Sequence, residues 1–546
     1  MPDRPAAAPR RADPALVIGP LLRRVVGDRA TIWVETSAPA TVRVRAGDAG
    51  GQARTFTAFG HHYALVEVAG LPQAAATAYE VLLDGVPVWP RPDRTLPPSV
   101  IRTRGPDAPV RLVFGSCREA THRTSARRLP PDALDAYARR LADEPPAALP
   151  DLLVLLGDQV SADETSATVR RWLRTRPRRS YAPEDQVMTF EEYTALYRES
   201  WRDPEIAWLL STVPSVMIFD DHEIVDDWNS SAYWRERIEG QPWWPERLTS
   251  GLASYWVYQH LGNLAPAELA ADPVFGRVRD AGDGTEALRT WAAEEAAGYR
   301  WSYLVELPGV RLVMLDNRAG RVLAPGRRSM LAEQDWHWLA DHATGEADHL
   351  LVGASLPWLL PPAVHHLEAV SERLAESGRA GVRRLGERLR LALDLEHWAA
   401  FRSSFDRLGA LWAQVGSAPR APATISVLSG DVHHSYVAEA LLPAAVRARV
   451  HQLTCSPLHN DVPEFMRPFL RVGWWRAAAV AARALARALR LPAPSVRWRR
   501  LAGPYFHNAL GTLTLRGRHA HVLFEGTAAD GRLRPVAEVT LSGPDG

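Results

Sequence analysis

Lysine is missing from this 546-residue chain, in which all 64 basic residues are arginines. The lack of lysine excludes Schiff-base catalysis and a lysine nucleophile. Only two cysteines are present, Cys117 and Cys455, so a disulfide framework is excluded and a reducing compartment is favoured. The formal net charge is only +1, which indicates no general attraction to nucleic acid or to an acidic membrane.

Long apolar runs are also missing, and no uninterrupted stretch is long enough to span a bilayer. Met1 to Ala15 is rich in proline and alanine and contains Arg10-Arg11, but Gly19-Pro20 interrupts the apolar segment that follows. This pattern is not typical of a signal peptide or of a twin-arginine export signal. We therefore expect a cytoplasmic protein with a disordered tail over residues 1–15.

The chain is too long for one simple core, so we expect more than one domain. Residues 16–106 contain short alternating segments, such as Ala30–Thr36 and Thr41–Arg45, and a turn signal at Asp84-Gly85. Such spacing is typical of a small antiparallel sandwich of the immunoglobulin or fibronectin type. A proline-rich and arginine-rich linker over Pro90–Pro109 closes this region.

The pattern changes in residues 107–546, where six short apolar runs each end in polar residues. Runs of this length are typical of strands that are buried on both faces. In open α/β sheets, ligands bind at the carboxyl ends of the strands. We therefore predict an α/β domain with a layered sheet core, outer helices and a site at the strand ends. The runs are residues 110–114, 152–156, 215–219, 310–315, 350–354 and 425–428.

Helices are predicted over Tyr233–Leu264 and in a block over Ala363–Trp412, and a closing hairpin is predicted over residues 510–524. Residues 474–491 indicate a basic amphipathic helix, which could make weak contact with a membrane. A charged face directed to solvent is the more common role of such a helix. Its arginines on one face are Arg476, Arg483, Arg487 and Arg490.

Acids, imidazoles and a thiol follow the apolar runs. A mixture of oxygen and nitrogen ligands suits a transition metal beside a harder cation, and two metals together can clamp a phosphate and activate water. Taken singly, aspartates at such turns also cap helices, and histidines such as His433 and His434 also pack in cores. Their convergence on one sheet edge favours a metal site.

Five motifs in order resemble those of the PhoD-like alkaline phosphatases, in the calcineurin-like metallophosphoesterase superfamily. The N-terminal Gly19-Pro20-Leu21-Leu22 and Thr31-Ile32-Trp33-Val34 also resemble the β-sandwich that precedes the catalytic domain in many members, so the resemblance covers nearly the whole chain. The five motifs are Phe114-Gly115-Ser116-Cys117, Gly157-Asp158-Gln159-Val160, Asp220-Asp221-His222-Glu223, Leu315-Asp316-Asn317-Arg318 and Ser429-Gly430-Asp431-Val432-His433-His434.

The resemblance implies two or more metal ions. A ferric-type site would use Cys117, Asp158, Asp431 and His433, and a neighbouring site with a calcium-like ion would use Asp158 and Asp221. The family pattern places a tyrosine three residues after the Gly-Asp aspartate, where this chain has a serine.

That residue, Ser161, offers no phenolate, which is a hard anionic ligand that favours Fe³⁺. The identity of the transition metal is therefore open between iron, zinc and manganese. Asp163 and Glu164 are candidates to compensate for the missing ligand.

The same resemblance places His222 near the leaving group, gives Arg318 the task of holding the phosphate, and includes His434 in catalysis. The function implied is metal-dependent hydrolysis of phosphate monoesters or diesters, with in-line attack by a metal-bound hydroxide. The partner expected is thus a phosphoester substrate, and no nucleic-acid-binding signature is present. A non-catalytic protein that binds metal and phosphate, with a sandwich that recruits a partner, is the alternative from a different class.

A further alternative of lower weight is a thiol phosphatase, because Cys117 and Arg123 satisfy the Cys-x₅-Arg spacing. Such a loop wraps phosphate with backbone N–H groups and needs glycines and positive charge. The five intervening residues contain no glycine and include Glu119. Cys455 is predicted to be a buried cysteine at a strand end.

Overall fold

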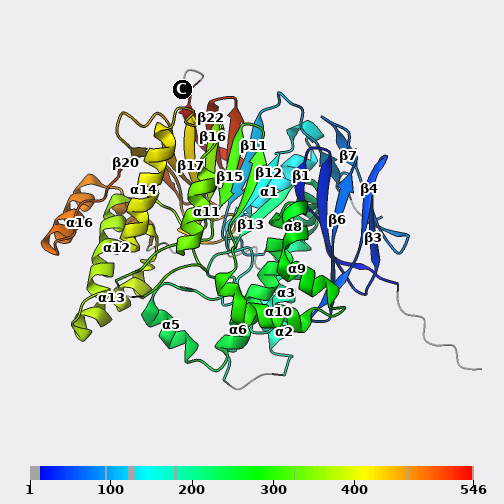
Figure 1. The fold of residues 1–546 in the computed structure, drawn as a ribbon, viewed down its shortest axis with the longest axis horizontal. Coiled ribbons are helices and arrows are strands. Elements are labelled where there is room, and N and C mark those ends of the chain that lie inside the picture. Colours follow the sequence, from blue (N-terminus) through cyan, green and yellow to red (C-terminus); the bar gives the residue numbers. More distant parts are fainter. Residues whose placement is uncertain are drawn as a thin grey trace, which may run out of the picture.

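The computed structural model describes residues 13–543, apart from 93–94, 121–128, 178–180, 325, 463 and 465. The chain has a mixed α/β fold, in which an all-β region, blue in Figure 1, lies beside a larger body of sheets and helices. Within the described residues, no helix has both the length and the apolar character needed to cross a membrane. Most of the predicted tail, residues 1–12, lies outside the described residues.

Strands are the regular elements from Leu16 to Arg102 in the part of the chain that is described. They form an antiparallel sheet in the order β1-β2-β6-β4-β3-β8-β9, with β5 paired to β6, and a separate β10-β7 pair. Side chains in β3 alternate between buried and less buried, so that Val42 and Val44 enter the core of this region. An immunoglobulin or fibronectin topology stays a prediction. The bounds are β1 (Leu16–Val26), β2 (Arg29–Thr36), β3 (Thr41–Ala46), β4 (Ala49–Arg54), β5 (Phe56–Ala58), β6 (His61–Ala69), β7 (Ala76–Ala78), β8 (Glu80–Leu83), β9 (Val86–Trp89) and β10 (Val100–Arg102).

Arg23 of β1 reaches from this region into the body. Its guanidinium is fully buried and donates to the backbone carbonyls of Ser215, Tyr258 and Gln259 and to Oδ1 of Asn263. Burial lowers the pKa of Arg23 to about 10. Burying a cation is costly unless its donors are satisfied, and four acceptors satisfy this one. The all-β region is therefore fixed to the body by a buried polar contact.

The body contains two sheets, in the orders β13-β12-β11-β21-β22-β23 and β14-β15-β16-β17-β19-β18-β20. Leu112 and Leu156 of the first sheet belong to the same buried cluster as Leu312 and Leu351 of the second, so the two sheets face each other. The bounds are β11 (Val110–Gly115), β12 (Leu152–Leu156), β13 (Ser215–Ile218), β14 (Tyr303–Leu307), β15 (Val310–Met314), β16 (His349–Gly353), β17 (Thr424–Ser429), β18 (Ser435–Leu441), β19 (Arg449–Thr454), β20 (Arg497–Tyr505), β21 (Ala509–Arg516), β22 (His519–Thr527) and β23 (Leu533–Ser542).

All six predicted buried strands are present, as β11, β12, β13, β15, β16 and β17, and they are divided between the two sheets. In the first sheet β12 is parallel to both β11 and β13, and in the second β16 is parallel to both β15 and β17. The carboxyl ends of the three strands therefore share one edge in each sheet. The predicted closing hairpin is β21 and β22.

Helices lie outside the sheets (Figure 1). Asp132 caps the first by accepting from the N–H groups of Leu134 and Asp135, and Thr189 with Glu192 forms a capping box at α3. The bounds are α1 (Ala133–Ala142), α2 (Ala167–Leu173), α3 (Phe190–Trp201), α4 (Pro204–Thr212), α5 (Ala232–Glu239), α6 (Trp244–Tyr255), α7 (Leu261–Asn263), α8 (Pro266–Ala271), α9 (Pro273–Asp280), α10 (Thr285–Thr290), α11 (Glu333–Ala343), α12 (Pro362–Ala375), α13 (Ala380–Leu393), α14 (Arg402–Ser417), α15 (Met466–Gly473) and α16 (Arg476–Ala488), with short 3-10 or π segments η1 (Pro146–Ala148), η2 (Trp256–His260), η3 (Trp291–Glu295), η4 (Ala296–Gly298) and η5 (Trp398–Ala400).

The helical block predicted over residues 363–412 is interrupted in the structure. α13 ends at Leu393, and Asp394 then adopts a left-handed conformation with a φ of 51°. A short irregular segment follows before η5 begins at Trp398. This interruption matters because the segment contributes Glu396 and His397 to the candidate site.

Candidate active site

Four side chains follow the carboxyl ends of parallel strands in the two sheets. Cys117 follows β11, Asp158 follows β12, Asp221 follows β13 and Asp431 follows β17. The backbone φ angles of Cys117, Asp158 and Asp431 are 54°, 51° and 64°. Non-glycine residues rarely adopt positive φ, and such strain gathers at functional sites. The two sheets therefore meet at a strained edge that carries three acids and a thiol.

Glycine precedes two of these aspartates because the chain is crowded there. A Cβ added to Gly430 would lie 1.9 Å from Ser116 Oγ, which links β17 to the end of β11 across the two sheets. A Cβ added to Gly157 would lie 2.7 Å from the Cβ of Asp220. The Gly-Asp motif is thus a packing requirement as well as a source of carboxylates.

Asp158, Asp220, Asp221 and Asp431 each offer a carboxylate oxygen within 4.8 Å of the others. Burial raises the pKa of Asp158 and of Asp220 well above the usual range, and neighbouring acids raise both further. Oδ1 of Asp158 and Oδ2 of Asp220 have no hydrogen-bond partner among the described residues. Buried acids with unused oxygens are a donor set that fits metal cations.

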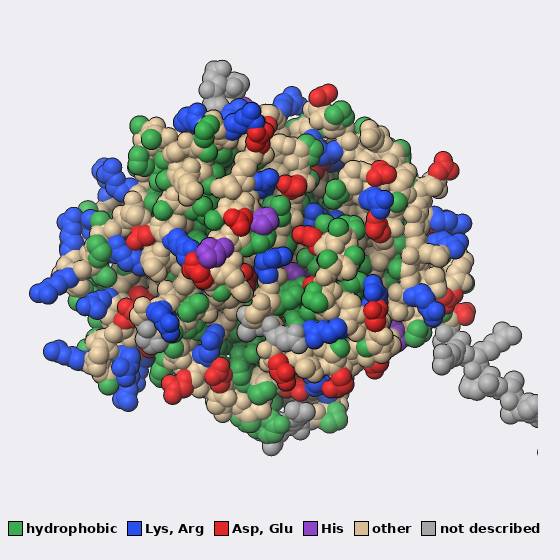
Figure 2. Space-filling model, viewed as in Figure 1, with side chains coloured by type: hydrophobic (Ala, Val, Ile, Leu, Met, Phe, Trp, Pro, Cys, Tyr) green, Lys and Arg blue, Asp and Glu red, His purple; other side chains and the backbone are tan. Residues whose placement is uncertain are grey.

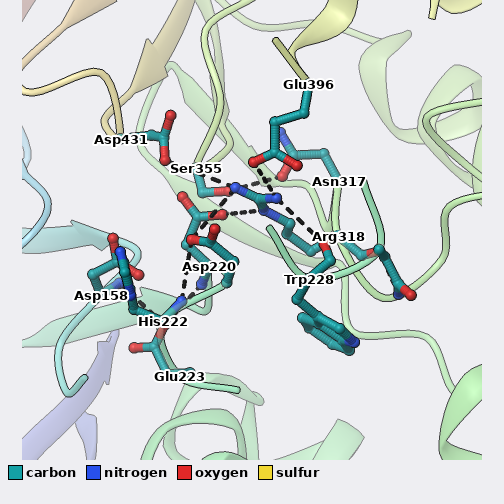
Figure 3. Close-up of polar contacts among 12 residues, drawn as sticks. Asp158, Asp220, His222, Glu223, Trp228, Asn317, Arg318, Ser355, Glu396 and Asp431 are labelled. Atoms are coloured by element: carbon teal, nitrogen blue, oxygen red, sulfur yellow. Dashed lines mark hydrogen bonds and ion pairs between the residues drawn. The ribbon is translucent and has the colours of Figure 1, made fainter. Parts of the chain in front are cut away.

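Arg318 lies against these aspartates with no exposed side-chain surface. Its Nε pairs with Asp220 and its Nη1 with Glu396, on either side of the guanidinium in Figure 3. Its Nη2 lies 3.4 Å from Asp221 Oδ1 and 3.8 Å from Asp431 Oδ1. Burial alone would lower the pKa of Arg318, but these acids raise it well above its usual range. The structure therefore places Arg318 as a counter-ion of the acids, and its contact with phosphate stays a prediction.

His222 is oriented by Asp163, whose Oδ1 lies 2.9 Å from His222 Nδ1. The other oxygen of Asp163 accepts from the backbone N–H of Asp226 at 2.6 Å. Burial alone would raise the pKa of Asp163 and lower that of His222. The attraction between the two outweighs it, so the pKa of Asp163 is lowered and that of His222 is raised. A hydrogen bond at Nδ1 leaves Nε2 of His222 as its available ring atom.

The two neighbouring histidines of the last motif lie in different surroundings. His433, with a φ of 48°, is part-buried and is not among the groups of close metal-ligating atoms found in the described residues. His434 is buried, and its ring stacks on Tyr436 and Phe506. Its Nδ1 lies 2.7 Å from the Val432 carbonyl, and burial lowers the pKa of His434 to about 4.

Cys117 Sγ lies 3.3 Å from Asp158 Oδ2 and 3.8 Å from the backbone carbonyl of Asp431. Burial raises the pKa of the Cys117 thiol well above its usual range, and Asp158 and Asp431 raise it further. These neighbours disfavour a free thiolate nucleophile. Arg123, on which the thiol-phosphatase alternative depends, lies outside the described residues. The other cysteine, Cys455, follows β19 and is fully buried, as predicted.

The Ser161 hydroxyl makes its hydrogen bonds within its own turn. Its Oγ donates to Asp163 Oδ1 at 3.2 Å and accepts from the backbone N–H of Glu164 at 2.9 Å. The hydroxyl therefore stabilises the turn in which Asp163 lies within hydrogen-bond distance of His222. Asp163 is thus engaged in hydrogen bonds and is not part of the aspartate group.

Sequence reasoning missed two residues between α13 and η5. His397 Nε2 lies 3.0 Å from Asp431 Oδ2, and its Nδ1 lies 2.6 Å from Glu368 Oε1. Glu396 pairs with Arg318 and, at 3.1 Å, with Arg321. The signal that could have found them is the run Asp394-Leu395-Glu396-His397, which is unusually polar for the middle of a helical block.

The sequence analysis also gave Glu223 no role of its own in the site. Its carboxylate accepts the backbone N–H groups of Asp158 at 3.1 Å, Gln159 at 2.8 Å and Asp220 at 2.8 Å. It therefore links the end of β12 to the end of β13 (Figure 3). A carboxylate in this position fixes the spacing of the aspartates without being one of the grouped ligands.

A cavity of about 230 Å³ opens beside the aspartates. Its lining is partly polar and partly apolar; we call the apolar part, which comes mainly from α12, α15 and the chain around them, the apolar wall. The polar lining is Asp158, Asp221, His222, Asp226, Asp394, His397, Asp431, His433 and His434, and the apolar lining is Leu360, Pro361, Val364, Leu393, Val432, Val462, Met466, Phe469 and Leu470.

Residues 117–272 match the family model of PhoD-like phosphatases. The resemblance to the PhoD-like phosphatases is confirmed. The PhoD-like match includes Cys117, Asp158, Asp221 and His222, and it ends before the second sheet that supplies Asp431. Residues 13–101 match a domain of unknown function, DUF7800. Comparison with the curated proteins gave no match.

The fold is similar to that of PhoD. The solved structure of PhoD superposes with a TM-score of 0.60 over 98% of this chain and 95% of that chain, at 13% sequence identity. The structure of the purple acid phosphatase PPD1 from yellow lupin (Lupinus luteus) seeds gives a TM-score of 0.49 over 97% of this chain and 74% of that chain, at 11% identity. The similarity of fold to PhoD covers nearly the whole chain and is not confined to residues 117–272.

Proposed function

We propose that this protein is a metal-dependent phosphoesterase that hydrolyses phosphate monoesters, diesters or both. The main support for the proposal is that three buried aspartates and the part-buried Asp431, supplied by both sheets, converge beside a cavity, and that two of their oxygens have no partner among the described residues. Buried carboxylates in that state favour cations over water. The family match at residues 117–272 supports phosphate esters as the substrate class.

The residues that would hold the metals are Cys117, Asp158, Asp221, Asp431 and His433. Asp158 is the bridging candidate, because its carboxylate lies beside the Cys117 thiol on one side and belongs to the aspartate group on the other. Metal ions bound there would lower the pKa of water and offset the charge of a phosphate. A thiolate with carboxylates suits a transition metal such as iron, zinc or manganese, and a position with carboxylates alone suits calcium.

Three side chains of the protein have proposed roles beside those of the metal ligands. His222, held through Nδ1 by Asp163, lines the cavity and presents Nε2 to protonate the leaving alcohol. Arg318 offsets the charge of the aspartates and sets their spacing. His397 holds Asp431 through Nε2 and is itself held by Glu368.

His434 is proposed to position the site rather than to donate a proton. Its Nδ1 carries hydrogen to reach the Val432 carbonyl, so Nε2 of the neutral ring has only a lone pair to offer. A pKa near 4 keeps the ring neutral at ordinary pH. The stacking on Tyr436 and Phe506 fixes its orientation.

Two measurements on the purified protein test the proposal. Elemental analysis should show bound metal, and a chromogenic monoester and diester should both be tried as substrates. Chelation should abolish turnover and added metal should restore it. Bound metal without turnover of either ester would favour the non-catalytic alternative, and full activity in metal-free protein that is lost on thiol alkylation would favour the Cys-x₅-Arg alternative.

A further inference from the structure

A long stretch near the carboxyl terminus has basic residues but no acidic ones. Between Glu464 and Glu525 the sequence contains no aspartate or glutamate, while arginines recur throughout. α15 and α16 lie within this stretch. α16 confirms the amphipathic helix predicted over residues 474–491.

α16 is apolar on two faces. Ala482 and Ala486 are buried on the inner face, where the helix packs against α12. On the outer face Val480 is 68% exposed and Leu485 is 47% exposed, and Trp475 just before the helix is 61% exposed. Four alanines of the helix are exposed beside them: Ala477, Ala481, Ala484 and Ala488. A helix that is merely solvated exposes mostly polar side chains, whereas most of the exposed positions of α16 are apolar.

Arginines flank the exposed apolar face. Arg476, Arg487 and Arg490 are exposed, and Arg483 is part-buried beside them. α13, which also packs on α12, carries further exposed arginines: Arg383, Arg384 and Arg388. Figure 2 shows basic side chains gathered on the left, where Figure 1 places α13 and α16, with hydrophobic side chains between them.

We propose that the outer face of α16 docks on an anionic lipid bilayer. Val480, Leu485 and Trp475 would enter the boundary between headgroups and acyl chains, and the flanking arginines would pair with lipid phosphates. The charge of the patch argues for this occupant, because an exposed apolar strip rimmed by arginines complements an apolar layer rimmed by anions. This docking does not depend on the hydrolase activity.

The docking surface adjoins the candidate site through α15. Met466, Phe469 and Leu470 of α15 line the apolar wall of the cavity, and α15 runs directly into α16 through Trp474 and Trp475. α12 supports α16 and also contributes Val364 to the same wall. The docking surface and the apolar wall are therefore connected through α12 and α15.

Vesicle flotation of the full chain tests the proposal. The wild-type protein should float with vesicles of about one-third phosphatidylglycerol in phosphatidylcholine at low salt, much less with pure phosphatidylcholine, and less as salt is raised. The double variant Val480→Asp/Leu485→Asp should lower the bound fraction by roughly tenfold or more. Arg476→Glu/Arg487→Glu should lower it by a similar factor.

Val86→Asp is the matched control, because Val86 is 54% exposed on β9 of the all-β region, far along the chain from α16. It should leave flotation unchanged. Turnover of a soluble ester, measured on the same samples, should be equal in wild type and in all variants, so a failure of docking is read separately from a failure of the proposed hydrolase.

Three results would overturn the proposal. The first is no flotation of the wild type with anionic vesicles. The second is equal flotation of the wild type and Val480→Asp/Leu485→Asp. The third is binding to lipid-free heparin that matches binding to vesicles and persists in that variant, which would show a polyanionic macromolecule as the partner.

Discussion

At the scale of single residues, Asp158 lies close to most of the candidate metal ligands. It contacts the Cys117 thiol, belongs to both groups of close ligand atoms that include Asp221, and keeps one oxygen without a partner among the described residues. We predict that Asp158→Asn loses metal and lowers the rate of ester hydrolysis by more than about 100-fold, the upper range for outer-shell changes, because a neutral amide is a poor bridging ligand. Metal content and kcat should be measured on the same preparation.

Asp48→Asn is the control for this substitution, since Asp48 is exposed on the turn between β3 and β4. It should change neither quantity. An Asp158→Asn protein with full metal content and full rate would contradict the two-metal proposal.

A second prediction at this scale concerns the identity of the metal and depends on Ser161. Its hydroxyl is engaged in the turn with Asp163 and Glu164, and Tyr436 donates its own hydroxyl to the Leu359 carbonyl at 2.7 Å. Tyr181 is 48% exposed. We therefore expect purified protein to lack a tyrosinate-to-iron absorption band and to prefer a divalent metal over Fe³⁺. A visible spectrum together with elemental analysis checks this.

Ser161→Tyr should shift the metal preference toward iron where the ring finds room. Stoichiometric Fe³⁺ with tyrosinate charge transfer in the wild type would show that another tyrosine supplies the ligand. Variants of Tyr181 and Tyr436 would then identify it.

At the scale of elements, the irregular segment between α13 and η5 places Glu396 between two buried arginines. Glu396 is 1% exposed, and Arg318 and Arg321 have no exposed side-chain surface. We predict that Glu396→Gln lowers the free energy of unfolding by about 3 kcal/mol, because it removes from the buried Arg321 the one carboxylate that pairs with it among the described residues, whereas Arg318 keeps Asp220. Urea unfolding curves measure this.

Glu346→Gln is the matched control, since Glu346 pairs with Arg420 at the surface, where their side chains are 72% and 76% exposed. Surface ion pairs contribute little, so no measurable change is expected. Equal effects of the two substitutions would show that Glu396 is not an essential counter-ion.

The strand-end part of the site was predictable from sequence, and the helical part was not. Asp158, Asp221 and Asp431 each follow an apolar run, and the rule that ligands bind at the carboxyl ends of parallel strands needs only those runs. Glu396 and His397 follow no strand, and only the long-range packing of α12 and α13 brings them to Asp431. The polar run that contains them marks them as unusual for a helical block, but it does not show which residue they contact.

Long-range contacts also limit what the sequence predicts about Arg318 and about the sheets. The position of Arg318 after β15 was found from the motif, but the burial of Arg318 between Asp220 and Glu396 depends on contacts among three separate segments. Likewise, six buried strands were predicted from apolar runs, while their division between two facing sheets depends on contacts such as the antiparallel pairing of β21 with β11, which is not local.

At the scale of the whole molecule, the all-β region and the body share buried polar contacts as well as apolar ones. Arg23 enters the body, and Glu35 of β2 accepts from the Tyr258 hydroxyl at 3.0 Å. His61 of β6 lies between Glu35 and Glu191 of α3, with ring-to-carboxylate distances of 3.0 Å and 2.7 Å. We infer that removal of residues 16–106 would leave the body with unpaired buried groups.

The last prediction concerns the pH dependence of this junction. Burial alone would lower the pKa of His61, but hydrogen bonds with Glu35 and Glu191 outweigh it and raise the pKa, even though Arg198 also faces the ring. A histidine whose folded pKa is raised stabilises the fold fully below its unfolded pKa, and this contribution is lost as pH rises through the folded pKa. His61→Gln should therefore lower the unfolding midpoint more at about pH 6 than at about pH 9. His337→Gln, at a histidine whose side chain is 73% exposed, should lower it at neither pH. Thermal unfolding of the three proteins at both pH values gives the comparison, and an equal loss at the two pH values would show that His61 contributes by packing rather than by charge.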